Sequence, residues 1–242
     1  MTKERRFDLV AFDMDGVLVD YPSSWTWIHN HFGVTNETSL EEYIRGEIDD
    51  TEFMRRDIAL WKACKKDLSK KDIESILTPL PLLKGIDETV RALKNAGMRT
   101  VIVSGGIDVI AERIKRIFGF DDYIANGLEF DEKGCLTGEG ILRVELTNKR
   151  RALDSFLHRW GISRNRVVSI GNSFVDVSMF EDCGLSIAFN PIDEVVVKNA
   201  DVIVRSNDLR AVLPIILEEP SQSPLYPYSP INGTKTQPPR FI

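Results

Sequence analysis

The sequence contains few cysteines and no long apolar run. Its three cysteines, Cys64, Cys135 and Cys183, lie far apart, and they match neither the spacing of zinc ligands nor a disulfide framework. This pattern favours a reducing compartment, so we expect a cytoplasmic protein. No apolar stretch approaches the roughly 20 residues of a membrane-spanning helix, and the charged N-terminal residues are not followed by the apolar core of a signal peptide. We therefore expect no membrane partner.

An excess of positive charge is also absent. The chain has 31 Lys and Arg residues against 37 Asp and Glu residues, which gives a formal net charge of −6. This balance disfavours nonspecific contact with nucleic acid, so we expect no nucleic-acid partner. Hydrophobic residues make up 43% of the 242 residues, as in ordinary globular proteins. The length suits one core domain with an insert, and the sequence leaves open a monomer or a homodimer.

Short apolar runs alternate with amphipathic stretches along most of the chain. Three of the amphipathic stretches end at a glycine, namely Gly97, Gly119 and Gly161, as helices commonly do. This alternation predicts an α/β fold in which crossover helices connect the strands of a doubly wound parallel sheet. The predicted strands span residues 9–13, 99–104, 167–171, 185–189 and 201–204, and the predicted helices include residues 87–95, 108–118 and 149–160.

Three segments depart from the alternation. Residues 22–82 contain amphipathic stretches without a clear strand, which predicts a small helical cap inserted after the first strand. Residues 124–146 hold two short β runs around a turn at 131–134, which predicts a β-hairpin flap beside the sheet. Residues 219–242 are rich in Pro, Ser and Tyr and are predicted to be extended or disordered. The remaining residues, 1–21 and 83–218, form the predicted core.

Two carboxylates stand at the end of the first predicted strand. Residues 9–12 are apolar and suit a buried parallel strand, and Asp13 and Asp15 follow them. In an open α/β sheet, ligands bind at the carboxyl ends of the strands. Two acids placed so close together repel each other unless a cation or a shared proton intervenes. The pair therefore predicts a metal site that takes part in chemistry.

Further polar groups lie where predicted strands end or helices begin. Ser104 and Gly105 end the second strand, Lys149 opens a helix, and Asn172 and Asp176 follow the third strand. In a doubly wound sheet they converge with the two aspartates on one crevice. These residue types suit phosphoryl transfer, because a carboxylate can attack phosphorus and a second acid can protonate the leaving oxygen. A lysine can neutralise charge, backbone N–H groups can hold phosphate oxygens, and Mg²⁺ prefers oxygen ligands.

Each of these residues also has a purely structural interpretation when it is taken alone. Residues 104–106 suit a strand-to-helix turn, Lys149 belongs to a basic run that could be solvated, and Asn172 suits a helix cap. The aromatic-rich stretch 25–32 is predicted to pack within the cap, and lining a substrate pocket is its second interpretation. Asp57 lies on an apolar helix stripe, where an ion pair with a cap arginine is the alternative to a contact with substrate.

Taken together, four segments in chain order resemble the motifs of the haloacid dehalogenase-like (HAD) hydrolase superfamily, in its phosphoserine phosphatase-like branch. They are DMDGVL, VIVSGG, NKRRAL with Lys149, and GNSFVDVSMF. The resemblance covers residues 7–216. It implies Mg²⁺-dependent hydrolysis of a small-molecule phosphate ester through an aspartyl-phosphate, with a cap that closes over the substrate and selects it.

The resemblance also assigns roles to individual residues. Asp13 would be the nucleophile and a Mg²⁺ ligand. Asp15 would be the general acid and base, with its backbone carbonyl on the metal. Lys149 would bridge the phosphate to Asp13.

The other motif residues would bind phosphate and metal. Ser104 and Gly105 would hold the phosphate, and Asn172 would complete the metal site with Asp176 in support.

The sequence departs from the pattern of that branch at two places. The family commonly has an aspartate where Asn172 stands, and because an amide carries no charge, we predict weaker Mg²⁺ binding. Pro22 stands where phosphoserine phosphatases use a glutamate to hold the substrate's amine. An ungapped count puts Asp57 where they use an arginine for the substrate's carboxylate, whereas a one-residue shift supplies Arg56. Asp57 and Arg56 are therefore both candidates for substrate binding, and the departures disfavour serine phosphate.

Three other functions remain open at this point. Asn172 is compatible with a catalytically weak or inactive phosphate-binding regulatory protein of the same superfamily. A dehalogenase that attacks carbon is disfavoured, because such enzymes lack the second acid of the first motif, here Asp15. Transfer of the phosphoryl group to another alcohol is the third alternative.

Overall fold

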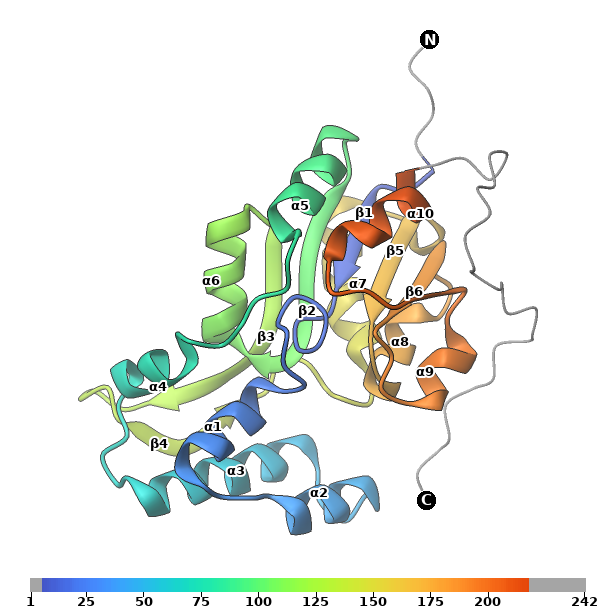
Figure 1. The fold of residues 1–242 in the computed structure, drawn as a ribbon. Helices are drawn as coiled ribbons and strands as arrows, with labels where there is room; N and C mark the ends of the chain where they lie inside the picture. The colour runs from blue at the N-terminus through green and yellow to red at the C-terminus, as the bar shows by residue number, and fades with distance from the viewer. Residues whose placement is uncertain (1–5, 218–242) are drawn as a thin grey trace.

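The computed structural model describes residues 6–217 and contains one seven-stranded sheet (Figure 1). The strand order is β4-β3-β2-β1-β5-β6-β7, and all neighbours are parallel except β3 and β4. The chain runs outward from β1 to β4 and returns to β5 on the other side, which places the switch point of the sheet at β1. The predicted doubly wound α/β fold is confirmed. The strands are β1 (Leu9–Phe12), β2 (Arg99–Ile107), β3 (Asp122–Phe130), β4 (Leu136–Ile141), β5 (Val167–Gly171), β6 (Leu185–Phe189) and β7 (Val202–Val204).

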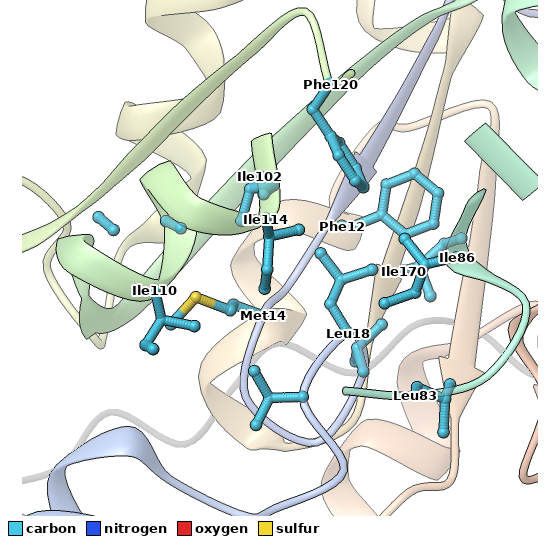
Figure 2. Packing of buried hydrophobic residues seen from close by; sticks show 14 of the residues in the cluster. Phe12, Met14, Leu18, Leu83, Ile86, Ile102, Ile110, Ile114, Phe120 and Ile170 are labelled. Carbon is cyan, nitrogen blue, oxygen red and sulfur yellow. The ribbon is translucent and has the colours of Figure 1, made fainter. Parts of the chain in front are cut away.

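Helices cover both faces of the sheet, so β1 is buried on both sides. Val10 and Phe12 point into the hydrophobic cluster under the helices α5, α6 and α10, whereas Leu9 and Ala11 point into the cluster under α7, α8 and α9. Figure 2 shows the first cluster, in which Phe12 packs edge-on against Phe120 with ring centroids 5.6 Å apart. The helices are α5 (Ile86–Asn95), α6 (Asp108–Phe118), α7 (Lys149–Trp160), α8 (Val177–Phe180), α9 (Glu194–Asn199) and α10 (Leu213–Leu217).

Five helices lie between β1 and β2, and the first four of them lie in the segment where the sequence predicts a helical cap. We call residues 22–82 the cap segment. Figure 1 shows α1, α2 and α3 beyond the arrowheads of β1 and β2, at the carboxyl end of the sheet. Three of the four helices begin at a side chain that accepts from the first turn, namely Ser23, Asp49 and Ser69. The helices are α1 (Ser24–Phe32), α2 (Glu37–Ile44), α3 (Asp50–Cys64) and α4 (Lys70–Leu77).

The predicted hairpin exists, but it is part of the sheet and does not lie beside it. The first half of β3 pairs with β2, from Val101 opposite Asp122 to Ser104 opposite Ala125, and its second half pairs antiparallel with β4. The predicted hairpin is thus confirmed, but its first strand begins at Asp122, earlier than expected, and is long enough to pair with both β2 and β4. The turn falls at 131–134 as predicted, with Gly134 in the left-handed region at φ 76°.

The structure also bears on the expectations for the tail, for membrane-spanning helices and for the cysteines. The predicted extended tail, 219–242, lies outside the described residues. Within residues 6–217, no helix combines the length and the apolar composition that crossing a membrane requires. The three cysteines, Cys64, Cys135 and Cys183, are free.

Candidate active site

A buried lysine lies between two carboxylates at the carboxyl end of the sheet. Lys149 is the first residue of α7, Asp13 directly follows β1, and Asp176 ends the short turn after β5. Lys149 Nζ donates to Asp13 Oδ1 over 2.8 Å and to Asp176 Oδ1 over 2.7 Å. The side chains have almost no exposed surface. Burial alone would lower the pKa of Lys149, but the two carboxylates raise it above its usual value, so the lysine stays charged.

Negative charge exceeds positive charge in this cluster. Burial raises the pKa of Asp13 to about 7, and the neighbouring Asp176 carboxylate adds to the rise while Lys149 opposes it. Buried carboxylates that face each other are unfavourable, and a further cation would relieve the repulsion. The arrangement therefore suits a nucleophile that is ionised when a cation is bound beside it.

Asp15 lies beside this cluster in a separate set of hydrogen bonds. Its Oδ2 accepts from the backbone N–H of Ser24 over 2.9 Å and from the Ser24 hydroxyl over 2.8 Å. Its Oδ1 is buried and has no hydrogen-bond partner within the described residues. Burial raises the pKa of Asp15 to about 6, against the effects of the Ser24 hydrogen bonds and of Lys149. A carboxyl group with a pKa near neutrality can both give and take a proton, as a general acid and base must.

The last residues of β2 form the wall of the site opposite Lys149. Ser104 is buried, and its hydroxyl accepts from the backbone N–H of Gly106 over 3.1 Å. A Cβ on Gly105 would stand 2.2 Å from Leu146 Cδ2, and a Cβ on Gly106 would stand 2.5 Å from Asp15 Oδ2. Both positions therefore need glycine, because the chain approaches its neighbours too closely for a side chain.

Asn172 and Asp176 follow β5 and belong to one turn. The backbone N–H groups of Asn172 and Ser173 donate to Asp176 Oδ2 over 2.8 and 3.0 Å. Asp176 therefore fixes this turn with one oxygen and Lys149 with the other. The Asn172 amide is buried against Gly16, where a Cβ would stand 2.0 Å from Asn172 Nδ2. These contacts hold Asn172 within the same cavity as Asp13.

The structure brings Asp57 to the site and leaves Arg56 outside it. Asp57 lines the cavity and accepts from Asn36 Nδ2 over 3.0 Å, while His29 Nε2 lies 3.3 Å from its Oδ2. Asp57 thus lies beside a histidine and not beside the cap arginine expected from the sequence. Arg56 is not among the residues that line the cavity. Its guanidinium instead pairs with Glu52 over 2.9 Å and with Glu42.

Two further residues contact the end of β2 at the site: the sequence analysis missed Asn126, and it gave a substrate pocket only as the second interpretation of the stretch that contains Trp25. Trp25 Nε1 donates to the carbonyl oxygen of Gly105 over 3.1 Å, and Asn126 Nδ2 donates to the same oxygen over 3.3 Å. Asn126 Oδ1 also accepts from the backbone N–H of Val144 over 2.8 Å, which ties β3 to the loop before α7. Asn126 had one signal, as the single polar side chain within residues 124–128 of β3. Nothing in the sequence distinguishes Trp25 from the aromatic residues that pack inside the cap segment.

These residues surround a cavity of about 400 Å³ between the end of the sheet and the cap segment. Ligand sites for small molecules in proteins usually have volumes of roughly 300–1,000 Å³. The cavity brings together most of the residues predicted from the sequence, and those that line it are Asp13, Asp15, Asp57, Ser104, Gly105, Lys149 and Asn172.

Known proteins are similar to this chain in both sequence and fold. The family model for haloacid dehalogenase-like hydrolase matches residues 10–181. The phosphoserine phosphatase of Idiomarina loihiensis is 31% identical over 210 residues, covering 85% of this chain and 91% of the relative. That of Methanocaldococcus jannaschii is 31% identical over 218 residues, covering 88% and 99%. A substrate-bound phosphoserine phosphatase complex and a phospho-aspartyl intermediate analogue of phosphoserine phosphatase both match with a TM-score of 0.75 and 30% identity, covering 88% of this chain and 100% of theirs.

The chain belongs to the haloacid dehalogenase-like hydrolase family. It lies in the phosphoserine phosphatase-like branch of that family and is a phosphatase that works through an aspartyl-phosphate.

Proposed function

We propose that this enzyme hydrolyses a small-molecule phosphate monoester in a Mg²⁺-dependent reaction, with Asp13 as the nucleophile. The observation that carries the proposal is the contact of Lys149 Nζ with Asp13 Oδ1 at 2.8 Å, deep in a cavity that Asp15 also lines. A charged lysine at that place lowers the cost of bringing an anionic phosphate to an anionic nucleophile.

The two aspartates divide the reaction between them. A carboxylate oxygen of Asp13 bonds to phosphorus while the bond from phosphorus to the ester oxygen breaks, and Asp15 gives its proton to the leaving alcohol. Asp15, now ionised, takes a proton from a water molecule whose oxygen bonds to the same phosphorus. The bond to Asp13 then breaks, which frees inorganic phosphate and restores both carboxyl groups.

The phosphate-binding role falls to the last residues of β2. The Ser104 hydroxyl and the backbone of Gly105 line the cavity beside Lys149. Trp25 and Asn126 hold the carbonyl oxygen of Gly105, so this part of the backbone is fixed before substrate arrives. A site that is ordered in advance loses less entropy on binding.

The donor atoms present fit Mg²⁺, which prefers oxygen ligands. The Asp13 carboxylate, the Asp15 backbone carbonyl and the Asn172 amide oxygen would hold it, with Asp176 in support, and the bound ion would neutralise charge on Asp13 and phosphate. Burial and the Asp176 carboxylate raise the pKa of Asp13, and a cation bound beside it would favour its ionised form.

The remaining assignments belong to the same proposal. The cap segment, residues 22–82, closes the substrate cavity, and residues 1–21 with 83–218 form the catalytic core. The three free cysteines fit a reducing compartment, so we place the enzyme in the cytoplasm. For its oligomeric state we propose a monomer or a homodimer.

The test compares Asp13→Asn with wild type, using p-nitrophenyl phosphate and Mg²⁺. We expect the variant to lose at least about 10³-fold in kcat, while the control Asp20→Asn, an exposed aspartate in the same loop, keeps the wild-type rate. Equal rates for Asp13→Asn and wild type would contradict the proposal. Binding of inorganic phosphate by wild type without turnover of any ester would instead favour the second candidate, a regulatory phosphate-binding protein. Asn172, which carries no charge at the proposed metal site, is the reason for this alternative.

A further inference from the structure

We propose that the substrate's leaving group is an apolar alcohol without a carboxylate, in contrast to phosphoserine. This inference rests on the proposed function and concerns the cap end of the same cavity. Three features carry it: the charges that line the cavity, the place of Arg56, and the apolar side chains around the mouth.

The charges in the cavity disfavour an anionic leaving group. Its charged lining residues are one lysine and four aspartates, namely Lys149, Asp13, Asp15, Asp50 and Asp57. The lysine is already engaged by the carboxylates of the catalytic cluster. A substrate carboxylate would therefore leave water without gaining a cationic partner among the described lining residues, and such burial is unfavourable.

The two aspartates at the cap end are held in place and cannot swing away from an approaching anion. Asp57 accepts from Asn36 over 3.0 Å and lies 3.3 Å from His29. Asp50 Oδ1 accepts from the backbone N–H of Leu146 over 3.0 Å and from the Tyr43 hydroxyl over 3.2 Å. Both carboxylates thus keep negative potential at this end of the cavity.

The one nearby arginine that the sequence offered for a carboxylate is turned away. Arg56 precedes Asp57 on α3, and successive helix residues point in directions about 100° apart. With Asp57 facing the cavity, Arg56 faces α2 and the first turn of α3, where it pairs with Glu42 and Glu52. Pro22 also lines the cavity and is uncharged, so the carboxylate of serine finds no cationic partner at this end among the described lining residues.

Apolar side chains continue from the cavity wall to its rim. The walls at the cap end include Trp25, Phe53 and Met54. The rim side chains also line the cavity and remain exposed: Leu40 by 42%, Ile44 by 44%, Phe174 by 37% and Ile192 by 66%.

Two of these rim residues belong to α2 and two to the loops after β5 and β6. They therefore approach the mouth from the cap side and from the sheet side. Exposed apolar surface gathered at a binding cavity marks the part of a ligand that it covers, and an apolar leaving group that reaches the rim would cover all four.

The test measures kcat/KM with Mg²⁺ for three esters: 2-phenylethyl phosphate, phosphoethanolamine and O-phospho-L-serine. We expect the phenylethyl ester to exceed phosphoserine by on the order of 10²-fold, and phosphoethanolamine, which lacks only the carboxylate, to exceed it as well. Phosphoserine turnover equal to or above the other two would overturn this inference and leave the proposed function standing. Absence of turnover for all esters would refute the proposed function and this inference with it.

A charge variant tests the same inference in the opposite direction. Leu40→Arg places a guanidinium at the rim on an exposed position, so we expect phosphoserine KM to fall and its kcat/KM to rise about tenfold relative to the phenylethyl ester. Ile44→Arg repeats the test if the first variant is unstable. Ile117→Arg, on an α6 position that is 52% exposed and outside the lining, is the matched control and should leave the ratio unchanged. An unchanged ratio in both rim variants would contradict the inference.

Discussion

The indole nitrogen of Trp25 lies 3.1 Å from the carbonyl oxygen of Gly105, so the first helix of the cap segment is hydrogen-bonded to the carboxyl end of β2. The Trp25 ring also stacks on Trp61, with centroids 5.3 Å apart, and Trp61 Nε1 donates to His29 Nδ1 over 2.7 Å. Because His29 lies 3.3 Å from Asp57, a continuous set of contacts joins the two ends of the cavity.

Trp25→Phe removes this donor and keeps an aromatic ring. We expect kcat/KM to fall on the order of tenfold, because the backbone that holds phosphate loses a support, and the unfolding free energy to fall by about 1 kcal/mol. Trp27→Phe is the matched control, since Trp27 Nε1 donates to the Ile76 carbonyl within the cap segment over 2.8 Å. It should lose similar stability in urea unfolding and keep its activity. Equal losses of activity in both variants would rule out a specific role for Trp25.

Gly105→Ala should be destabilising through one identifiable clash. The added Cβ would stand 2.2 Å from Leu146 Cδ2, and overpacking of this kind costs about 1–3 kcal/mol. In the double variant with Leu146→Ala the clash is absent, so the loss measured by thermal unfolding should be smaller than the sum of the two single losses. Additive losses would show that the glycine is needed for a different reason.

Asn172→Asp should strengthen Mg²⁺ binding. The carboxylate adds a negative charge to the donor set, and we expect the Mg²⁺ concentration for half-maximal activity to fall about tenfold. The thermal shift on adding Mg²⁺ should increase in parallel, because a ligand stabilises the state that binds it. Asn165→Asp adds the same charge at an exposed position and should change neither quantity. An unchanged metal requirement in Asn172→Asp would place the ion elsewhere.

Rising pH should destabilise the metal-free enzyme relative to Asp13→Asn. The pKa of Asp13 is about 7 in the folded chain, above its ordinary value of 3.8. Between these values the folded state holds more protons than the unfolded state, so the stability from this group is complete at low pH and is lost as the pH rises through 7. From about pH 5 to about pH 7.5 in EDTA, wild type should lose roughly 1 kcal/mol or more relative to the variant in urea unfolding. A difference that does not vary with pH would show that Asp13 is ionised throughout.

The order of strands and helices could be predicted because each central strand is buried on both faces and each helix on one. Helices α6 and α7 end where predicted, since Gly119 and Gly161 take the left-handed conformation that closes a helix. The joining of the hairpin to the sheet was not predicted, because a sequence pattern does not show that one strand pairs with two partners along its length. The proximity of the motif residues was also predictable, because the carboxyl ends of parallel strands meet at one edge of the sheet.

Other parts of the site depend on geometry that the sequence does not contain. Asp57 and Arg56 are adjacent, and only the rotation of α3 about its axis decides which of them reaches the cavity. Ser24 was missed because its two hydrogen bonds to Asp15 depend on where the chain turns after the first motif. Serine is common in such loops and gives no signal of its own.

The contacts between the cap segment and β4 also cover an edge of the sheet that could otherwise pair with a second copy of the chain. β4 is one edge of the sheet. An uncovered edge strand has free backbone N–H and C=O groups, which can pair with a strand of another copy. Lys62 Nζ donates to the carbonyl oxygens of Leu136 and Thr137 over 2.6 and 2.8 Å, while the N–H of Leu136 donates to the carbonyl of Leu68 over 2.9 Å. A chain without residues 22–82 would therefore expose this edge of the sheet and aggregate more readily.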